Sequence, residues 1–114
     1  MECRCTHNSG FVPGETASQI WRIPYPAQFI ARVVVTYSQA GEQVLLREFD
    51  AAEGGETEGA TITVDLTQAE SLSFRDLVPI EVQINALLVS GERVASKIVL
   101  LPVGQQTYRE ELIV

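Results

Sequence analysis

The sequence predicts an all-β domain, because its apolar residues recur in short runs with a period of two. Two pairs of these runs are joined by short glycine-containing turns, which is typical of β-hairpins. Turn signals recur about every 8–12 residues, a spacing typical of immunoglobulin-like sandwiches. The chain has 114 residues, 46% of them apolar, which suits one domain with its own core. We therefore predict an immunoglobulin-like β-sandwich of roughly six to seven short antiparallel strands with extended N- and C-terminal arms.

The first predicted strand ends at a pair of prolines. Trp21, Ile23 and Tyr25 alternate with polar or proline positions from residue 19 onward, which predicts one buried face. Pro24 and Pro26 cannot donate to a ladder, so this end of the strand is expected at or beyond a sheet edge.

The first predicted hairpin joins residues 29–37 to residues 43–49. The first of these runs is dense in β-branched and aromatic residues and is the expected central strand. Gly41 lies in the short turn over residues 38–42 and can adopt the positive φ that hairpin turns need. The residues expected on one face of the central strand are Ala31, Val33, Val35 and Tyr37.

A polar, glycine-rich loop over residues 50–59 leads to a short strand over residues 60–66. Thr67 and Glu70 then have the spacing of a capping box, which predicts a single helical turn.

The second predicted hairpin starts with the clearest alternation in the chain, over residues 80–88. A turn over residues 90–92 leads into a return strand over residues 93–103, which completes an antiparallel pair. On the return strand we expect Val94, Ser96, Ile98 and Leu100 to share a face.

The strands lie between an N-terminal segment without a regular period and a short amphipathic C-terminal segment, whose apolar end of Leu112, Ile113 and Val114 is expected to dock somewhere. We therefore divide the chain into an extended N-terminal arm (1–17), a sandwich domain (18–103) and a C-terminal extension (104–114). We expect both ends to become ordered on contact with other subunits. Arg4 and Arg109 lie in these segments, where a guanidinium group can pair with a neighbour's carboxylates.

Charge excludes some partners. With 8 basic and 15 acidic side chains and a net charge of −7, neither a nucleic-acid groove nor binding to an anionic membrane is expected. The first ten residues are polar and the apolar runs are short, so we expect neither a secretory signal nor a membrane span.

Cys3, Cys5 and His7 are the only cluster of soft metal ligands. Thiolates and imidazole are what zinc or copper selects, but three ligands on an arm leave a tetrahedral shell incomplete. An ordinary terminal segment is the favoured interpretation, and we predict no cofactor and no catalytic residue.

Two other groups of residues have a functional and a structural interpretation. The acidic residues Glu48, Asp50, Glu53, Glu56 and Glu58 could hold calcium, but they lack the usual loop pattern, so a solvated loop is favoured. The aromatic residues Trp21, Tyr25, Tyr37 and Tyr108 could stack on a sugar. Core packing is favoured, because Trp21 and Tyr37 fall on the apolar faces of their strands.

Several motifs resemble those of a family of small proteins encoded by phages and prophages of gut bacteria. One is Val-x-Val-x-Tyr-x-Gln at residues 33–39, and the others are Ile20–Tyr25, Leu66–Phe74, Ile80–Leu87 and Gly91–Ser96. The resemblance runs from about residue 18 to residue 114 and leaves the N-terminal segment uncovered.

The resemblance implies a structural component of a phage particle and not an enzyme. No catalytic or ligand residue carries over from this family, and Gln68, Phe74, Ala95 and Ser96 look like framework positions. The expected location is the virion, and the expected partners are other virion proteins and further copies of this chain. The alternative is a carbohydrate- or cell-surface-binding β-sandwich module.

Overall fold

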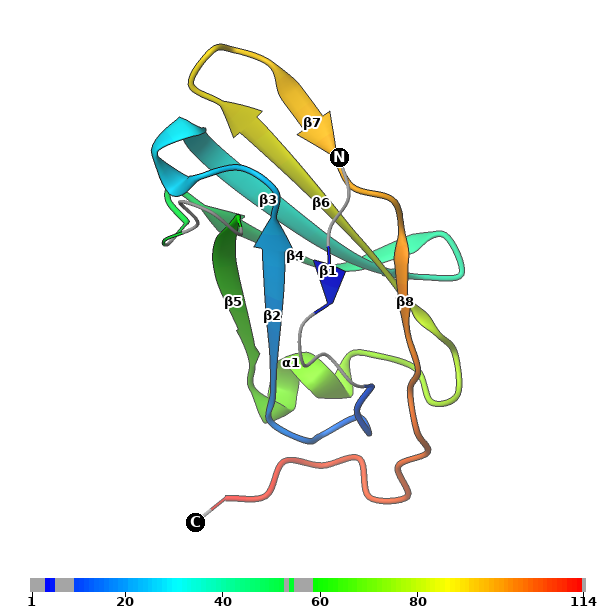
Figure 1. Ribbon diagram of the computed structural model, residues 1–114. Helices are drawn as coiled ribbons and strands as arrows, with labels where there is room; N and C mark the ends of the chain where they lie inside the picture. Colours follow the sequence, from blue (N-terminus) through cyan, green and yellow to red (C-terminus); the bar gives the residue numbers. More distant parts are fainter. Residues whose placement is uncertain (1–3, 6–9, 53, 55–58, 114) are drawn as a thin grey trace.

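The computed structural model describes residues 4–5, 10–52, 54 and 59–113. Their strands form two antiparallel sheets that pack face to face (Figure 1). One sheet has the order β1-β2-β5, and the other has the order β4-β3-β6-β7 with β8 also paired to β6. The strands are β1 Arg4–Cys5, β2 Ala17–Ile23, β3 Ile30–Gln39, β4 Glu42–Phe49, β5 Ala60–Leu66, β6 Ile80–Leu88, β7 Arg93–Ala95 and β8 Val99–Leu101. The predicted immunoglobulin-like β-sandwich is confirmed.

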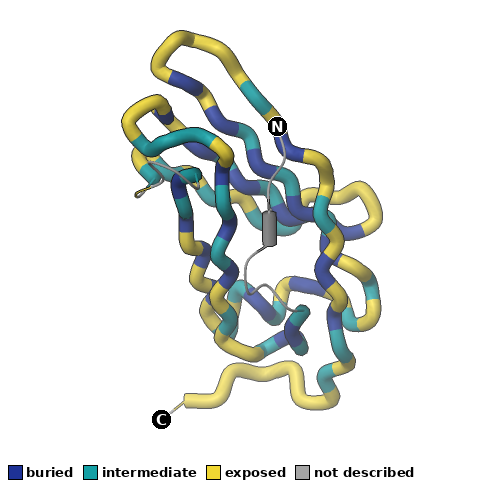
Figure 2. The backbone as a smooth tube through the Cα atoms, in the orientation of Figure 1, coloured by how far each residue is buried: buried dark blue, intermediate teal, exposed yellow. Residues whose placement is uncertain are grey.

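The core lies between the two sheets and follows the alternation of the sequence. Along β6, Ile80, Val82, Ile84 and Ala86 are buried, whereas the residues between them are partly exposed. Figure 2 shows the same alternation along the facing strands. Because every second side chain enters the core, a slip of one residue would turn the apolar side chains of a strand away from it, and this specifies how the strands pair.

The first hairpin forms as predicted, with one correction at its start. Gln39 pairs with Glu42, so the connection is the two residues Ala40 and Gly41, both with positive φ. At the other end of β3 the pairing with β6 shifts between residues 30 and 32. This bulge changes the phase of the alternation, so Ile30 is buried in place of the predicted Ala31.

The second hairpin is interrupted, and the predicted face of its return strand is wrong in part. β7 pairs with the end of β6 and β8 pairs with its beginning. Between them Ser96 is buried, and its Oγ accepts a hydrogen bond from Ile84 N at 2.9 Å. The break after Ser96 changes the side-chain phase. Ile98 and Leu100 are therefore exposed, and Leu101 is buried instead.

The predicted helical turn is α1, Gln68–Leu72, and its capping box is complete. The Thr67 hydroxyl accepts from Glu70 N, and Glu70 Oε1 accepts from Thr67 N at 3.0 Å. That backbone hydrogen bond, aided by the nearby Arg47 guanidinium, holds the pKa of Glu70 below its ordinary value. α1 thus lies in the connection from β5 to β6, directly after the end of β5.

Replacing Thr67 with alanine is expected to lower the free energy of unfolding by about 1 kcal/mol, because it removes the N-cap acceptor. Urea unfolding of Thr67→Ala beside Thr67→Ser measures this loss, and the serine variant should stay close to wild type. Thr107→Ala is the matched control, since Thr107 is exposed. Equal losses for the two alanine variants would contradict a capping role.

Residues 10–17, which the sequence places in an extended arm, lie against the sandwich. Phe11 is buried, forms an isolated parallel bridge with Val103 and packs edge-on against Phe74 with ring centroids 5.6 Å apart. Gly10 allows this approach, since a Cβ there would lie 1.9 Å from the Pro102 carbonyl oxygen. The described part of this segment therefore closes one end of the core.

Candidate interaction surfaces

The structure describes little of the predicted soft-ligand cluster. Cys3 and His7 lie outside the described residues. Cys5 lies in β1 and is described only by its backbone pairing with Trp21 of β2. Within the described ranges, no group of three or more His, Cys, Asp or Glu side chains is close enough to hold a metal ion. The same ranges contain no helix long and apolar enough to cross a membrane.

The acidic loop is also described only in part. Glu53, Glu56 and Glu58 lie outside the described residues. Glu48 lies in β4, where its carboxylate accepts a hydrogen bond from Arg32 at 2.5 Å. Glu48 therefore forms part of a charged pair on the sheet surface.

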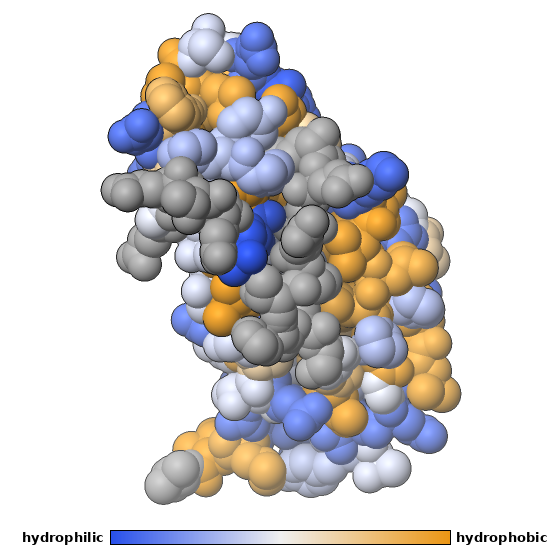
Figure 3. Space-filling model, viewed as in Figure 1, coloured by the Kyte–Doolittle hydropathy of each residue, from blue (hydrophilic) through white to orange (hydrophobic). Residues whose placement is uncertain are grey.

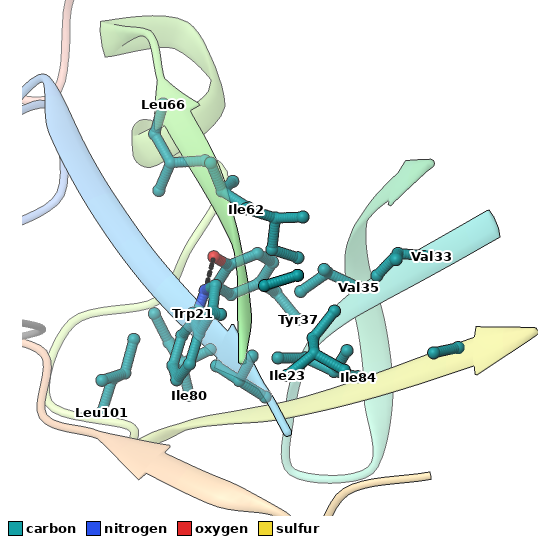
Figure 4. Close-up of a cluster of buried hydrophobic side chains, with 14 of the residues drawn as sticks. Trp21, Ile23, Val33, Val35, Tyr37, Ile62, Leu66, Ile80, Ile84 and Leu101 are labelled. Carbon is teal, nitrogen blue, oxygen red and sulfur yellow. Dashed lines mark hydrogen bonds between the residues drawn. The ribbon is translucent and has the colours of Figure 1, made fainter. Parts of the chain in front are cut away.

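The aromatic residues do not form a stacking platform. Trp21 and Tyr37 are fully buried between the sheets, as predicted from their strand faces. The Trp21 indole N–H donates to the Tyr37 hydroxyl at 3.2 Å (Figure 4), and that hydroxyl donates to the amide oxygen of the buried Gln19 at 3.1 Å. Tyr25 is partly buried against the core, and Tyr108 is exposed in the C-terminal segment. Trp21 and Tyr37 thus serve the core.

The outer face of the β4-β3-β6-β7 sheet carries a hollow of about 430 Å³. We call it the outer hollow, and its lining includes Arg32, Val34, Glu48, Asn85, Leu87 and Arg93. The register places Arg32 opposite Leu87 on β6, and Leu87 opposite Arg93 on β7. An apolar side chain therefore stands in one row between two arginines.

The charges of the outer hollow are only partly balanced. Arg32 is paired with Glu48, as described above. Arg93 instead donates from Nε and Nη2 to the amide oxygen of Asn85, at 3.3 and 3.2 Å. Leu87, which the register places between the two arginines, is 42% exposed. In a chain of net charge −7, this surface therefore suits a partner that is both acidic and apolar.

The C-terminal segment lies under α1 and is held by side chains on both sides. Arg109 pairs with Asp76 and donates to the backbone carbonyl oxygens of Leu72 and Phe74, both at 2.9 Å. The Gln68 amide exchanges two hydrogen bonds with the backbone of Leu112, at 2.8 and 2.9 Å. The segment thus follows a defined path along the body of the molecule, although its residues from 107 to 113 are exposed (Figure 2).

The end of this segment exposes apolar side chains. Leu112 is 69% exposed and Ile113 is 90% exposed, directly after Glu110 and Glu111. Figure 3 shows the apolar atoms standing apart at the C-terminal end of the molecule. We call residues 110–113 the C-terminal tip.

The sequence indicated the C-terminal tip only in part, because its apolar end was expected to dock whereas Leu112 and Ile113 are exposed. It did not reveal the outer hollow. The sequence offered Arg109 as a residue able to pair with a neighbour's carboxylates, and the structure shows that it pairs with Asp76 of its own chain. The arginine row of the outer hollow depends on strand register, which composition does not reveal. Its one signal in the sequence was Leu87, an apolar residue at a position where the alternation of residues 80–88 predicts a polar one.

No family model matches the chain, and no curated protein matches it. Among solved structures, it is similar to the fibronectin(III)-like modules of Clostridium thermocellum CbhA, with 11% sequence identity and a TM-score of 0.49. The match covers 90% of this chain and 94% of that one.

Proposed function

We propose that this chain is a non-enzymatic structural component of a bacteriophage particle, associated with the capsid, connector or tail. It assembles with neighbouring subunits through its terminal segments and exposed sheet surfaces. The observation that carries the assembly role is the C-terminal tip, where Leu112 and Ile113 are exposed on an anchored backbone. The phage setting is carried by the sequence motifs over residues 18–114.

The geometry of the tip supports assembly for a physical reason. Exposed apolar side chains at one end of a rigid body gain free energy when a partner covers them. The anchors at Arg109 and Gln68 already restrict the backbone, so less conformational entropy is lost on binding. A subunit that fixes the spacing of its neighbours needs such a preordered contact.

Mass spectrometry of purified particles from the source phage tests the proposed role. We expect the chain to be present at a reproducible ratio to the major capsid protein. Its absence from particles that contain all the other structural proteins would overturn the proposal. As a control, isotope-labelled free chain is added before purification. The amount of labelled chain found in the particles measures adventitious carry-over.

The alternative, a carbohydrate-binding module, predicts a different environment for the aromatic residues. Because Trp21 is fully buried, we expect its emission to be blue-shifted, weakly quenched by acrylamide and unchanged by added glycans. Tyr108→Ala should leave this emission unchanged, since Tyr108 is exposed in the C-terminal segment. A saturable change in Trp21 emission on glycan addition would favour the sugar-binding alternative.

A further inference from the structure

We propose that the outer hollow binds the C-terminal tip of a second copy of this chain. This interaction rests on the proposed function and names the partner for the tip. The hollow is the receptor surface and the tip is the ligand. In each contact, one copy therefore contributes the outer hollow and the other copy contributes the C-terminal tip.

The receptor surface has the features that such a ligand needs. Leu87 lies in the Arg32–Leu87–Arg93 row with 42% of its surface exposed. Arg93 is hydrogen-bonded to a neutral amide, so a carboxylate that approaches it gains a charge-assisted hydrogen bond that the free protein lacks. Anions are repelled by much of this acidic molecule. Because Arg32 is already paired with Glu48, Arg93 is the arginine of the hollow that attracts a further carboxylate.

The tip supplies the complementary groups. Glu110 and Glu111 provide carboxylates, and Leu112 and Ile113 provide exposed apolar area next to them. The Leu112 backbone is bound to Gln68 on its own subunit. A partner can therefore contact the exposed side chains of the tip while these backbone hydrogen bonds stay in place.

The ligand must come from another molecule. The outer hollow lies near the β6–β7 turn, whereas the described C-terminal segment runs past α1 at the opposite end of the molecule (Figure 1). The molecule is 46 Å long, and the anchors at Arg109 and Gln68 hold the segment beside α1. A contact between the tip and its own hollow would require both anchors to break.

Such a contact joins two different surfaces, so it is heterologous. Repeated head to tail, it generates a closed ring or an open chain, depending on the rotation between neighbours. Until a ring closes, the subunit at one end of the assembly has an unoccupied hollow and the subunit at the other end has an unoccupied tip.

Sedimentation velocity of the purified full-length chain over a range of concentrations tests this arrangement. We expect association that increases with concentration, to a closed dimer where the rotation closes a ring of two copies and to larger assemblies otherwise. Arg93→Glu alters the hollow, and Leu112→Asp combined with Ile113→Asp alters the tip while leaving the backbone hydrogen bonds to Gln68 in place. Each variant alone should associate at least about tenfold more weakly, since a carboxylate facing the tip's glutamates or a charged tip facing Leu87 is disfavoured.

Mixing the two variants gives the sharper result. The Arg93→Glu variant keeps an intact tip, and the Leu112→Asp, Ile113→Asp variant keeps an intact hollow. One copy of each can therefore form a single contact, after which both remaining surfaces are altered. The mixture should therefore form dimers and stop there. Leu77→Asn is the matched control, because Leu77 is 67% exposed and lies in neither surface. It should associate like wild type.

The outcomes separate this proposal from the proposed function. A wild-type chain that stays monomeric at all concentrations, or association that neither variant weakens, overturns the contact between hollow and tip. Neither result affects the proposed function, because the presence of the chain in phage particles is tested separately by mass spectrometry. Conversely, association of the expected kind together with absence from particles overturns the phage role and keeps the contact. Circular dichroism of each variant confirms that it is folded before association is compared.

Discussion

Replacing Gln39 with leucine is expected to lower the free energy of unfolding by about 3 kcal/mol. Gln39 is fully buried at the end of β3, next to the first hairpin turn. Its amide nitrogen donates to the carbonyl oxygens of Arg75 and Val78, at 3.0 and 2.8 Å, and its amide oxygen accepts from Arg75 N at 2.7 Å. One side chain thus holds the loop that connects α1 to β6.

Leucine fills a similar volume but leaves these three backbone groups without their partner. A buried polar group that loses its hydrogen bond retains the cost of desolvation, so the loss exceeds the net contribution of an ordinary hydrogen bond. Urea unfolding at constant pH measures the difference. Gln43→Leu is the matched control, because Gln43 is exposed on β4, and it should change stability by less than about 0.5 kcal/mol. Similar losses for the two variants would show that the loop does not depend on Gln39.

The role of Gln39 illustrates why part of this fold could not be predicted from the sequence. The sequence places Gln39 in a polar turn, since it precedes Ala40 and Gly41 and is itself polar. The alternation of β3 in fact continues through it into the core, and its partners lie 36 and 39 residues further on. Local patterning predicts which face a residue occupies, but not which distant backbone groups will satisfy it.

Elements whose signals are local were predicted well. The capping box at Thr67 and the hairpin turn at Gly41 depend on residues a few positions apart, so the sequence contains the whole signal. The bulge near Ile30 and the break at Ser96 depend on pairing with β6, and each changes the phase of the residues beyond it. Such a change moves apolar side chains to the other face, and this explains the errors at Ala31, Ile98 and Leu100.

The candidate surfaces follow the same rule. The sequence showed that residues 104–114 end in apolar residues, and it named Arg109 as a pairing residue. It could not show that Arg109 is used by its own chain, because Asp76 lies 33 positions away. The outer hollow needs the register of three strands before its two arginines can be placed beside Leu87.

Replacing Phe11 with alanine is expected to lower the free energy of unfolding by about 3–4 kcal/mol, at the lower part of the range for buried phenylalanine. Only 7% of Phe11 is exposed, and its ring packs edge-on against Phe74, which itself packs edge-on against Tyr37. Truncation therefore leaves a cavity at the end of the core and removes an aromatic contact. A loss of this size would be absent if residues 10–17 formed a free arm, because an exposed phenylalanine contributes little to stability.

Phe29→Ala is the matched control for Phe11→Ala, since it removes the same atoms from a side chain that is 47% exposed. We expect it to cost less than about 1 kcal/mol in the same urea titration. Equal small losses for the two variants would mean that the N-terminal segment does not belong to the cooperative unit. A large loss for Phe11→Ala alone would instead mean that this segment folds with the sandwich. The N-terminal boundary of the domain would then move from residue 18 toward residue 10.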